Sequence, residues 1–359
     1  MDSEQTLDDA WNRLAVSRRG ETQLGISFRP LQVEAFGLDA NATLDQLLRY
    51  PFHLIRLAAY WNRIETRAGV FDARDLDRHL EAADRAGKQV IISVGAVKNF
   101  GYPEFYVPDW MLERPLREGS LVRPSTHPAL LAGATRFIAE IVKRYRDVSS
   151  VVAWQLEHEA VDPLGVEHSW RLGLEFVQAE LDALREADPS RPVLMNGFLP
   201  TSSVVRISQW WNTRDQGDSI AAAARMADIV GIDYYPRHAL FALGRKTLYL
   251  DAARLPWQKA HTRAVVRSIR GRGKRLMVSE GQAEPWEAVT APPNPVARAM
   301  FSCGPQDVIE NYNAAIGWSE ASASIDAYLF WGAEYWVLRD RSGDPSYLRA
   351  FGRILEESG

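Results

Sequence analysis

Cysteine is nearly absent from this chain, because Cys303 is its single thiol. One thiol cannot build a disulfide framework, and no Cys-x-x-Cys or Cys/His spacing of a zinc site is present. His53 and His79 also have no partner at a spacing that metal ligands use. The sequence therefore predicts a protein that needs neither a metal ion nor another cofactor.

Long apolar runs and blocks of positive charge are absent as well. No run of about 18 apolar residues occurs, and the first residues are acidic and lack the apolar core of a secretory signal. Lys and Arg are offset by acids throughout, at a formal net charge of -4. We expect a cytoplasmic protein that binds neither membranes nor nucleic acids, although a secreted chain without its signal peptide would have the same pattern. The oligomeric state is left open.

What the chain does contain is an alternation of short β-rich runs with longer helical patterns. The β-rich runs are 24–28, 53–60, 89–94, 151–154, 192–196, 228–235, 275–280 and 327–331. The helical patterns include 73–86, 128–145, 167–187, 256–269, 306–322 and 345–357. This order predicts an α/β fold with parallel strands, and the length suits a (β/α)8 TIM barrel. An open, doubly wound sheet is the alternative, but no Gly-rich phosphate turn follows the first run.

We expect a single domain, because no linker or low-complexity segment divides the chain. Residues 1–23 are predicted to form a lead-in with a helix over 5–18, and residues 24–359 to form the catalytic barrel. The long loops follow the third, fifth, sixth and seventh strands, so they share the C-terminal face of the barrel. They carry aromatic residues such as Trp210 and Trp286, which indicates a cleft for a ring-shaped ligand. Packing of the loops against themselves is the simpler alternative.

The stretch VVAWQLEHEAVD, residues 151–162, carries the first candidate catalyst. It begins as an apolar strand and ends in Glu157, His158 and Glu159. A buried strand has no structural need for so many polar groups, and the C-terminal strand ends of a barrel form the catalytic mouth. Glu159 is therefore predicted to be catalytic. Glu157 is expected to bind a substrate hydroxyl or to form a structural pair.

A second carboxylate, Glu280, ends the seventh strand. Two carboxylates across a barrel mouth can divide the work of glycosidic cleavage, one as the acid and the other as the nucleophile. Arg56, near the end of the second strand, is expected to point inward beside Glu280, with a structural salt bridge as the alternative. Asp233 and Tyr235 share one face of the sixth strand by the alternation of side chains, so both are expected at the same site.

Several of these segments resemble clan A glycoside hydrolases, with similarity to families 35, 42 and 5. The segment WQLEHE, residues 154–159, looks like the WQxENE segment of families 35 and 42. The segment GIDYYP, residues 231–236, is similar to the G-x-N-Y-Y motif of family 1 and its relatives. Glu280 and Trp331 match the strand-seven nucleophile and the strand-eight tryptophan that forms the floor of the sugar site. The resemblance spans residues 25–331.

The resemblance implies a retaining glycoside hydrolase that cleaves β-glycosidic bonds of small glycosides or oligosaccharides by double displacement. Glu280 would be the nucleophile and Glu159 the general acid/base. The expected substrate-binding residues are Arg56, His158, Glu157, Tyr235, Asp233, Trp331, Trp286 and Trp61. Two alternatives stay open, namely a transglycosidase that uses the same site and a carbohydrate-binding protein without catalysis.

Two positions depart from the clan's pattern. His158 stands where the pattern has an Asn whose amide contacts the sugar 2-hydroxyl, and one imidazole nitrogen cannot both donate and accept. Asp233 stands where family 1 usually has Asn, which adds an acid near the site. We expect the sugar preference to differ accordingly, through an altered sugar, a substituted C2 or a furanose ring.

Overall fold

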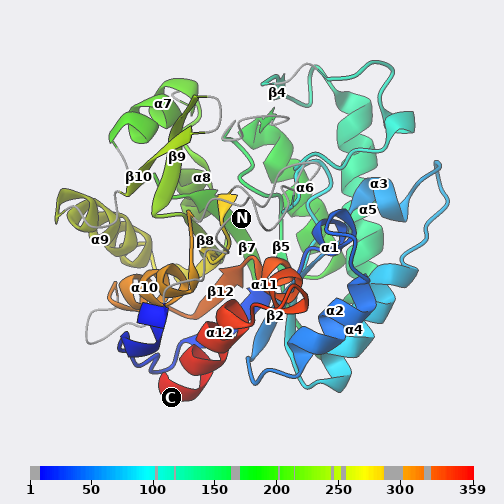
Figure 1. Cartoon of the computed structure of the whole chain (residues 1–359). Coiled ribbons are helices and arrows are strands. Elements are labelled where there is room, and N and C mark those ends of the chain that lie inside the picture. Colours follow the sequence, from blue (N-terminus) through cyan, green and yellow to red (C-terminus); the bar gives the residue numbers. More distant parts are fainter. Residues whose placement is uncertain are drawn as a thin grey trace.

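The structure is a computed structural model that describes residues 9–101, 104–116, 119–162, 170–200, 203–213, 215–243, 246–251, 256–286, 302–318 and 325–359. Eight strands in this part of the chain close into a parallel barrel (Figure 1). They are β1 (Gln23–Ser27), β2 (Leu54–Ala58), β3 (Gln89–Ser93), β5 (Val151–Gln155), β7 (Val193–Phe198), β8 (Ile229–Tyr234), β11 (Arg275–Gln282) and β12 (Ala327–Trp331). β1 pairs with both β2 and β12, which closes the ring. The predicted TIM barrel is thereby confirmed.

Helices surround the barrel and cover the outer faces of its strands (Figure 1). The longer ones are α2 (Ala40–Leu48), α4 (Arg74–Arg85), α5 (Pro128–Tyr145), α6 (Leu174–Ala187), α7 (Ser203–Thr213), α8 (Ser219–Met226), α9 (Pro256–Gly271), α10 (Pro305–Ile316), α11 (Ala333–Arg341) and α12 (Ser346–Glu357). Short ones are α1 (Pro30–Ala35), α3 (Trp61–Ile64), and the 3-10 turns η1 (Asp9–Arg13) and η2 (Asp109–Met111). No helix among those described is long and apolar enough to cross a bilayer.

Helix α4 illustrates how the sequence dictates these elements. Its buried residues Leu76, Leu80 and Ala83 recur at helical spacing and form one apolar stripe. Acidic residues lie in its first turn, where they favour the helix dipole. The helix ends before Gly87, whose φ of 67° is the left-handed conformation that glycine adopts at low cost. The stripe therefore faces the barrel and the charged face remains in solvent.

Several segments differ from the sequence prediction. The loop expected over 236–255 contains a hairpin, β9 (Arg237–Leu243) with β10 (Lys246–Asp251), and the loop over 197–219 contains α7. The helix predicted over 167–187 begins only at Leu174, after the short strand β6 (Arg171–Leu172), which pairs with β4 (Leu121–Val122), and residues 167–169 lie outside the described part. The lead-in helix predicted over 5–18 is only the turn η1 among the described residues, and residues 5–8 lie outside them. Helix α10 ends at Ile316, and residues 319–322 of the predicted helix lie outside the described part.

Candidate active site

The interior of the barrel changes from apolar to polar along the strands. An apolar layer fills its lower part with side chains from the strands, namely Leu54, Ile91, Ala153, Leu194, Ile229, Met277, Ala327 and Leu329. Arg56, Gln155 and Asn196 stand two residues after members of this layer on β2, β5 and β7. Since strand side chains alternate between faces, these three polar groups also point inward, one layer nearer the C-terminal mouth.

Glu280 is held at this mouth by two donors. Arg56 Nη2 donates to its Oε1 over 2.6 Å, and the Tyr235 hydroxyl donates to its Oε2 over 2.5 Å. Tyr234 instead lies on the other face of β8, where its ring packs edge-on against Trp318 at 4.7 Å. The structure thus brings Arg56, Tyr235 and Glu280 together in one buried cluster.

A bulge in β11 aims two consecutive side chains into the site. The register pairs Val278 with Ile232 and Glu280 with Asp233, so Ser279 is an extra residue on this strand. The Ser279 hydroxyl donates to Asp233 Oδ1 over 2.7 Å, while Glu280 reaches Arg56. Regular alternation would have placed these neighbours on opposite faces of the strand. The bulge therefore brings both the Glu280 carboxylate and the Ser279 hydroxyl, which donates to Asp233, into the site.

The pKa of Glu280 is the outcome of opposing influences. Burial and then the nearby Asp233 carboxylate raise the pKa of Glu280 to about 8, and the Arg56 guanidinium and the Tyr235 hydroxyl oppose this rise. The Tyr235 pKa is raised well above its ordinary value by burial and by Glu280, so its hydroxyl keeps its proton and remains a donor. Any loss of negative charge at Asp233 would favour the ionised form of Glu280.

Glu159 follows β5 in a strained backbone. Its φ of 43° and that of Glu157, 49°, lie in the left-handed region, which side chains other than glycine adopt at a cost. The Lys98 ammonium stabilises this turn by donating to the carbonyl oxygens of Glu159 over 2.7 Å and of Asp162 over 2.9 Å. Burial, Asp233 and Glu104 raise the pKa of Glu159 well above its ordinary value. These surroundings favour the protonated form of Glu159.

Glu157 was expected to bind substrate or to form a structural pair, and its surroundings favour a structural role. Its carboxylate accepts from the backbone N–H of Val97 over 3.0 Å and of Lys98 over 2.5 Å, and only 1% of the residue is exposed. Burial raises the pKa of Glu157 to about 7, and these two amides oppose the rise. The backbone of Glu157 also packs so closely on Gly95 that a Cβ there would lie 2.6 Å from the Glu157 Cα. Glu157 joins the ends of β3 and β5 and does not face the mouth.

A chain of amide groups fixes the hydrogen-bonding directions inside the site. Arg56 can only donate, and its Nη1 donates to Gln155 Oε1 over 3.0 Å. Gln155 Nε2 then donates to Asn196 Oδ1 over 3.1 Å. Asn196 Nδ2 must consequently be a donor, and it contacts Asp233 Oδ2 at 2.6 Å and His158 Nδ1 at 2.9 Å. The orientation of every amide in this chain follows from the guanidinium at its start.

This chain sets the tautomer of His158. Because Nδ1 accepts from Asn196, the proton of the neutral ring lies on Nε2. Burial and then Arg56 and Lys98 lower the pKa of His158 well below its ordinary value, which keeps the ring neutral. Nε2 lies 3.8 Å from Glu104 Oε1, and Nδ1 lies 3.5 Å from Glu280 Oε1. The His158 ring thus lies between Glu280, the candidate nucleophile, and Glu104 on the loop after β3.

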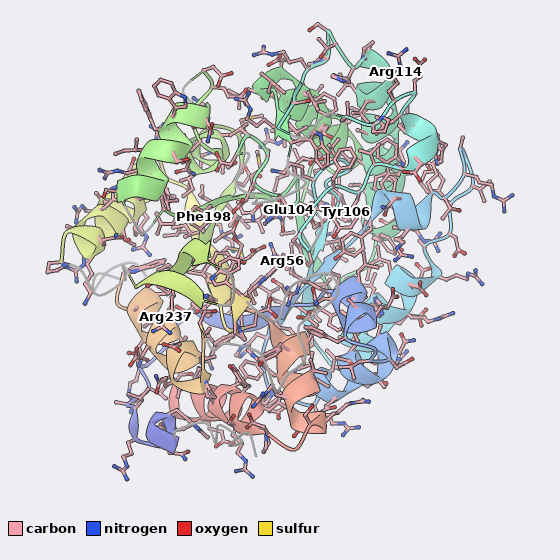
Figure 2. All side chains as sticks on the ribbon, turned by 45° about the horizontal axis from the view of Figure 1, so that its top comes forward. Arg56, Glu104, Tyr106, Arg114, Phe198 and Arg237 are labelled. Atoms are coloured by element: carbon pink, nitrogen blue, oxygen red, sulfur yellow. The ribbon has the colours of Figure 1, made fainter. Side chains whose placement is uncertain are left out.

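Aromatic rings line the same mouth. Buried or half-buried rings form one cluster that includes Tyr60, Phe100, Tyr106, Phe198, Tyr235 and Trp331. Figure 2 shows Arg56, Glu104 and Tyr106 labelled close together near the centre of the barrel, with Phe198 and Arg237 on another side. The guanidinium of Arg29, itself paired with the buried Glu284 and Glu334, lies 4.3 Å from the centre of the Trp331 ring. Trp286 is 38% exposed and packs on Tyr235 with ring centres 4.8 Å apart.

The structure does not bring Trp61 to this site. Its ring is fully buried and stacks on Phe137 with centres 5.5 Å apart, and its indole N–H donates to Glu65 over 2.7 Å. Gly133 of α5 packs directly on the same ring, since a Cβ there would lie 2.9 Å from it. Trp61 is therefore a core residue between α3 and α5, which corrects its expected role in substrate binding.

Two groups of side chains at the mouth have the donor atoms of a metal site. Glu104, His158 and Glu159 form one group, and His158, Asp233 and Glu280 form the other. In the first group the Nε2 of His158 carries the proton, and in the second its Nδ1 already accepts from Asn196. A metal ion at the first group would require the other tautomer of His158, and one at the second would displace the hydrogen bond from Asn196. The donor set is thus better suited to hydrogen bonding than to coordination.

The sequence prediction missed several polar groups at the site. Lys98 and Glu104 lie on a long loop whose path has no periodic signal. Asn196 could have been found, because it is a polar residue near the C-terminal end of an apolar strand, the same signal that singled out Glu159. Ser279 could not, because its inward orientation depends on the bulge.

The comparisons with known proteins support the architecture. No protein-family model matches the chain, and no curated protein matches its sequence. Its fold is similar to that of a β-galactosidase from Rahnella sp. R3, at a TM-score of 0.58 and 12% identity, over 95% of this chain and 56% of that one. It is also similar to GH5_18 from Streptomyces cattleya in complex with GlcNAc, at 0.57 and 12%, over 88% and 71%. Xylanase 10B from Thermotoga maritima gives 0.53 and 15%, over 95% and 98%. At these identities the likeness establishes a shared TIM-barrel fold.

Proposed function

We propose that this protein is a retaining glycoside hydrolase that cleaves β-glycosidic bonds by double displacement. The observation that carries the proposal is the contrast between two buried carboxyl groups. Glu280 is bound by a guanidinium and a phenol hydroxyl, whereas Glu159 is surrounded by the acids Asp233 and Glu104. Two carboxyl groups with such different environments suit the roles of nucleophile and acid. The glycosidases among proteins of similar fold support the same reading.

In the first step, a Glu280 oxygen attacks the anomeric carbon as the bond to the leaving oxygen breaks. Glu159 gives its proton to that oxygen, so the leaving group departs as an alcohol. The attacking carboxylate loses negative charge, and Arg56 and Tyr235 hold it in place through both of its oxygens. In the second step, Glu159 takes a proton from water, whose oxygen attacks the anomeric carbon and releases Glu280. Two inversions retain the configuration.

The gap between His158 and Glu104 supports recognition of a sugar hydroxyl. An oxygen placed about 2.8 Å from both atoms bridges their separation at an angle of roughly 85°, which hydrogen-bond geometry allows. Such a hydroxyl would accept from Nε2–H of His158 and donate to the Glu104 carboxylate. Because Nδ1 of the same ring is 3.5 Å from Glu280 Oε1, this hydroxyl belongs next to the reacting carbon. We propose that it is the hydroxyl on C2, which takes the place of the contact that an Asn makes in related enzymes.

Three further assignments belong to the proposal. Trp331 forms the floor of the sugar site and Trp286 its outer wall, because Trp331 lies in the same aromatic cluster as Tyr235 and the Trp286 ring packs on Tyr235. We place the enzyme in the cytoplasm, where small glycosides or oligosaccharides would be its substrates. Residues 24–359 act as one catalytic barrel.

The roles can be tested with Glu280→Gly and Glu159→Ala, assayed on aryl β-glycosides with and without azide. Azide should rescue Glu280→Gly to an α-glycosyl azide, because it replaces the nucleophile on the opposite face. It should rescue Glu159→Ala to a β-glycosyl azide, because it attacks the glycosyl-enzyme. If neither variant loses activity, or if Glu159→Ala gives the inverted azide, the assignment is wrong.

A further inference from the structure

Asp233 has no exposed surface, and its two oxygens are already occupied. Ser279 Oγ donates to Oδ1 over 2.7 Å and Asn196 Nδ2 donates to Oδ2 over 2.6 Å. Its relative exposure is 0%, compared with 4% for Glu159. A side chain so enclosed does not reach a sugar, which argues against the substrate-binding role expected from the sequence.

The group that Asp233 does contact is the acid. Asn196 links the two residues, because its Oδ1 accepts from the backbone N–H of Glu159 over 3.4 Å and its Nδ2 donates to Asp233 Oδ2 over 2.6 Å. The electrostatics of the site likewise couple the two carboxyl groups through a hydrogen bond. Two carboxyl groups form such a bond only when a proton lies between them. Ser279 and Asn196 are both donors to Asp233, so Asp233 is the acceptor in the pair and the proton resides mainly on Glu159.

We propose that Asp233 is a positioning residue that holds the catalytic proton on Glu159 through a carboxyl–carboxylate pair fixed by Ser279 and Asn196. The inference rests on the proposed function, in which Glu159 is the acid. When Glu159 transfers its proton to the leaving oxygen, both members of the pair become anions. Their repulsion raises the basicity of Glu159, which then takes a proton from water in the second step. The pair thus serves both steps without consuming any other reactant.

The ionisable groups around the pair of Glu159 and Asp233 include more acids than cations. The ionisable groups that face it are Glu104 and Lys98 from the loop after β3, Asp162 and His158 from the segment after β5, Arg56 from β2, Tyr235 after β8 and Glu280 from β11. His158 and Tyr235 are neutral, so Arg56 and Lys98 are the cations among these groups. The carboxyl groups outnumber them, and a shared proton relieves the excess.

The pair can be tested by titrating Glu159 in the ligand-free protein. The side-chain carboxyl carbon is followed by NMR after 13C labelling of glutamate and is assigned by its loss in Glu159→Gln. In Asp233→Asn, the introduced amide removes a neighbouring charge, and the Glu159 midpoint should fall by about 1 to 3 pH units. In Ser279→Ala, Asp233 loses a donor and becomes more basic, so the shared proton shifts toward Asp233 and the Glu159 midpoint should fall as well.

An unchanged Glu159 midpoint in Asp233→Asn, or an unchanged or higher midpoint in Ser279→Ala, would overturn the inference. If Asp233→Asn does not fold, as judged by circular dichroism, the direction of the shift in Ser279→Ala decides alone. The alkaline limb of kcat/KM for 4-nitrophenyl β-glycosides should move in the same direction as the midpoint in each variant. If Glu159→Ala retains full activity, the proposed function fails, whereas the titration still reports on the pair. A raised KM in Asp233→Asn with unmoved pH limbs would instead indicate a substrate contact.

Discussion

The amide nitrogen of Asn196 donates to Nδ1 of His158 over 2.9 Å. This one bond places the ring proton on Nε2, opposite Glu104, and makes His158 a donor toward the mouth. An Asn at that position could offer both a donor and an acceptor, whereas His158 supplies only the donor and Glu104 the acceptor. The change of residue therefore divides one recognition function between two elements of the fold.

Glu104→Gln tests this division. The variant should lower kcat/KM for glycosides that carry a C2 hydroxyl by about 10- to 100-fold, which corresponds to the loss of one hydrogen bond to a charged group. It should change kcat/KM for the matching 2-deoxy glycosides little, because they lack the hydroxyl. His158→Ala should show the same selectivity. Equal losses on both substrate types would contradict recognition of the C2 hydroxyl.

The activity should have an unusually alkaline pH profile. Glu280 must be ionised to attack, so kcat/KM should be lost as the pH falls through its pKa, which burial and Asp233 raise to about 8. Glu159 must be protonated, so kcat/KM should also be lost as the pH rises through its raised pKa. Both limbs therefore lie above the ordinary carboxyl range. An acid limb near about pH 4, as for an unperturbed carboxyl group, would contradict this account.

Arg56→Met should destabilise the protein strongly. Arg56 is fully buried and bonds with Ser27, Gln155 and Glu280, so its removal leaves the buried Glu280 without its positively charged partner. The free energy of unfolding should fall by about 3–5 kcal/mol in urea titrations. Arg74→Met is the matched control, because its pair with Asp72 is exposed. Equal midpoints for the two variants would show that the buried pair is not structural.

Glu157→Ala separates a structural role from a role in binding. The variant leaves the buried N–H groups of Val97 and Lys98 without their acceptor, which costs about 1–3 kcal/mol for each group. Thermal unfolding should therefore begin at a lower temperature, while KM at a temperature where the variant is folded stays close to that of the wild type. A raised KM at unchanged stability would restore Glu157 to the substrate site.

Two tryptophans provide a matched comparison. Trp331→Ala should raise KM for aryl glycosides, because it removes a ring from the mouth. Trp61→Ala should leave KM unchanged but lower the free energy of unfolding by about 3–5 kcal/mol, because a buried ring is lost from the core. Steady-state kinetics and denaturant titration of both variants check this. A KM effect of Trp61→Ala in the folded protein would contradict its placement.

The alternation of β-rich runs with helical patterns was sufficient to predict the barrel. Glu159 and Glu280 stood out because carboxyl groups at the ends of buried apolar strands are unusual, and Arg56 was expected to point inward near the end of its strand. Alternation of side chains placed Asp233 and Tyr235 on one face of β8. Alternation fails where the backbone departs from a regular strand. The bulge at Ser279 and the left-handed turns at Glu157 and Glu159 change which side chains face inward, and no pattern in the sequence marks them.

The paths of the loops are the other feature that could not be predicted from the sequence. Glu104 reaches the site only because the loop after β3 folds back over the mouth, and Trp61 turned out to lie in a helix–helix core. Single tryptophans have no periodic context that distinguishes a sugar platform from a packed ring. The proposed role of Asp233 depends on three partners from β7, β11 and the segment after β5, which are distant in sequence.

The most direct test of the central claim is covalent trapping of the nucleophile. The protein is incubated with 2,4-dinitrophenyl 2-deoxy-2-fluoro-β-glycosides of a panel of sugars and then digested for peptide mass spectrometry. The account predicts that a glycosidase substrate from the panel leaves one fluoroglycosyl group as an ester on Glu280. A label on Glu159 or on another residue, or inverted product from a substrate that turns over, would contradict it.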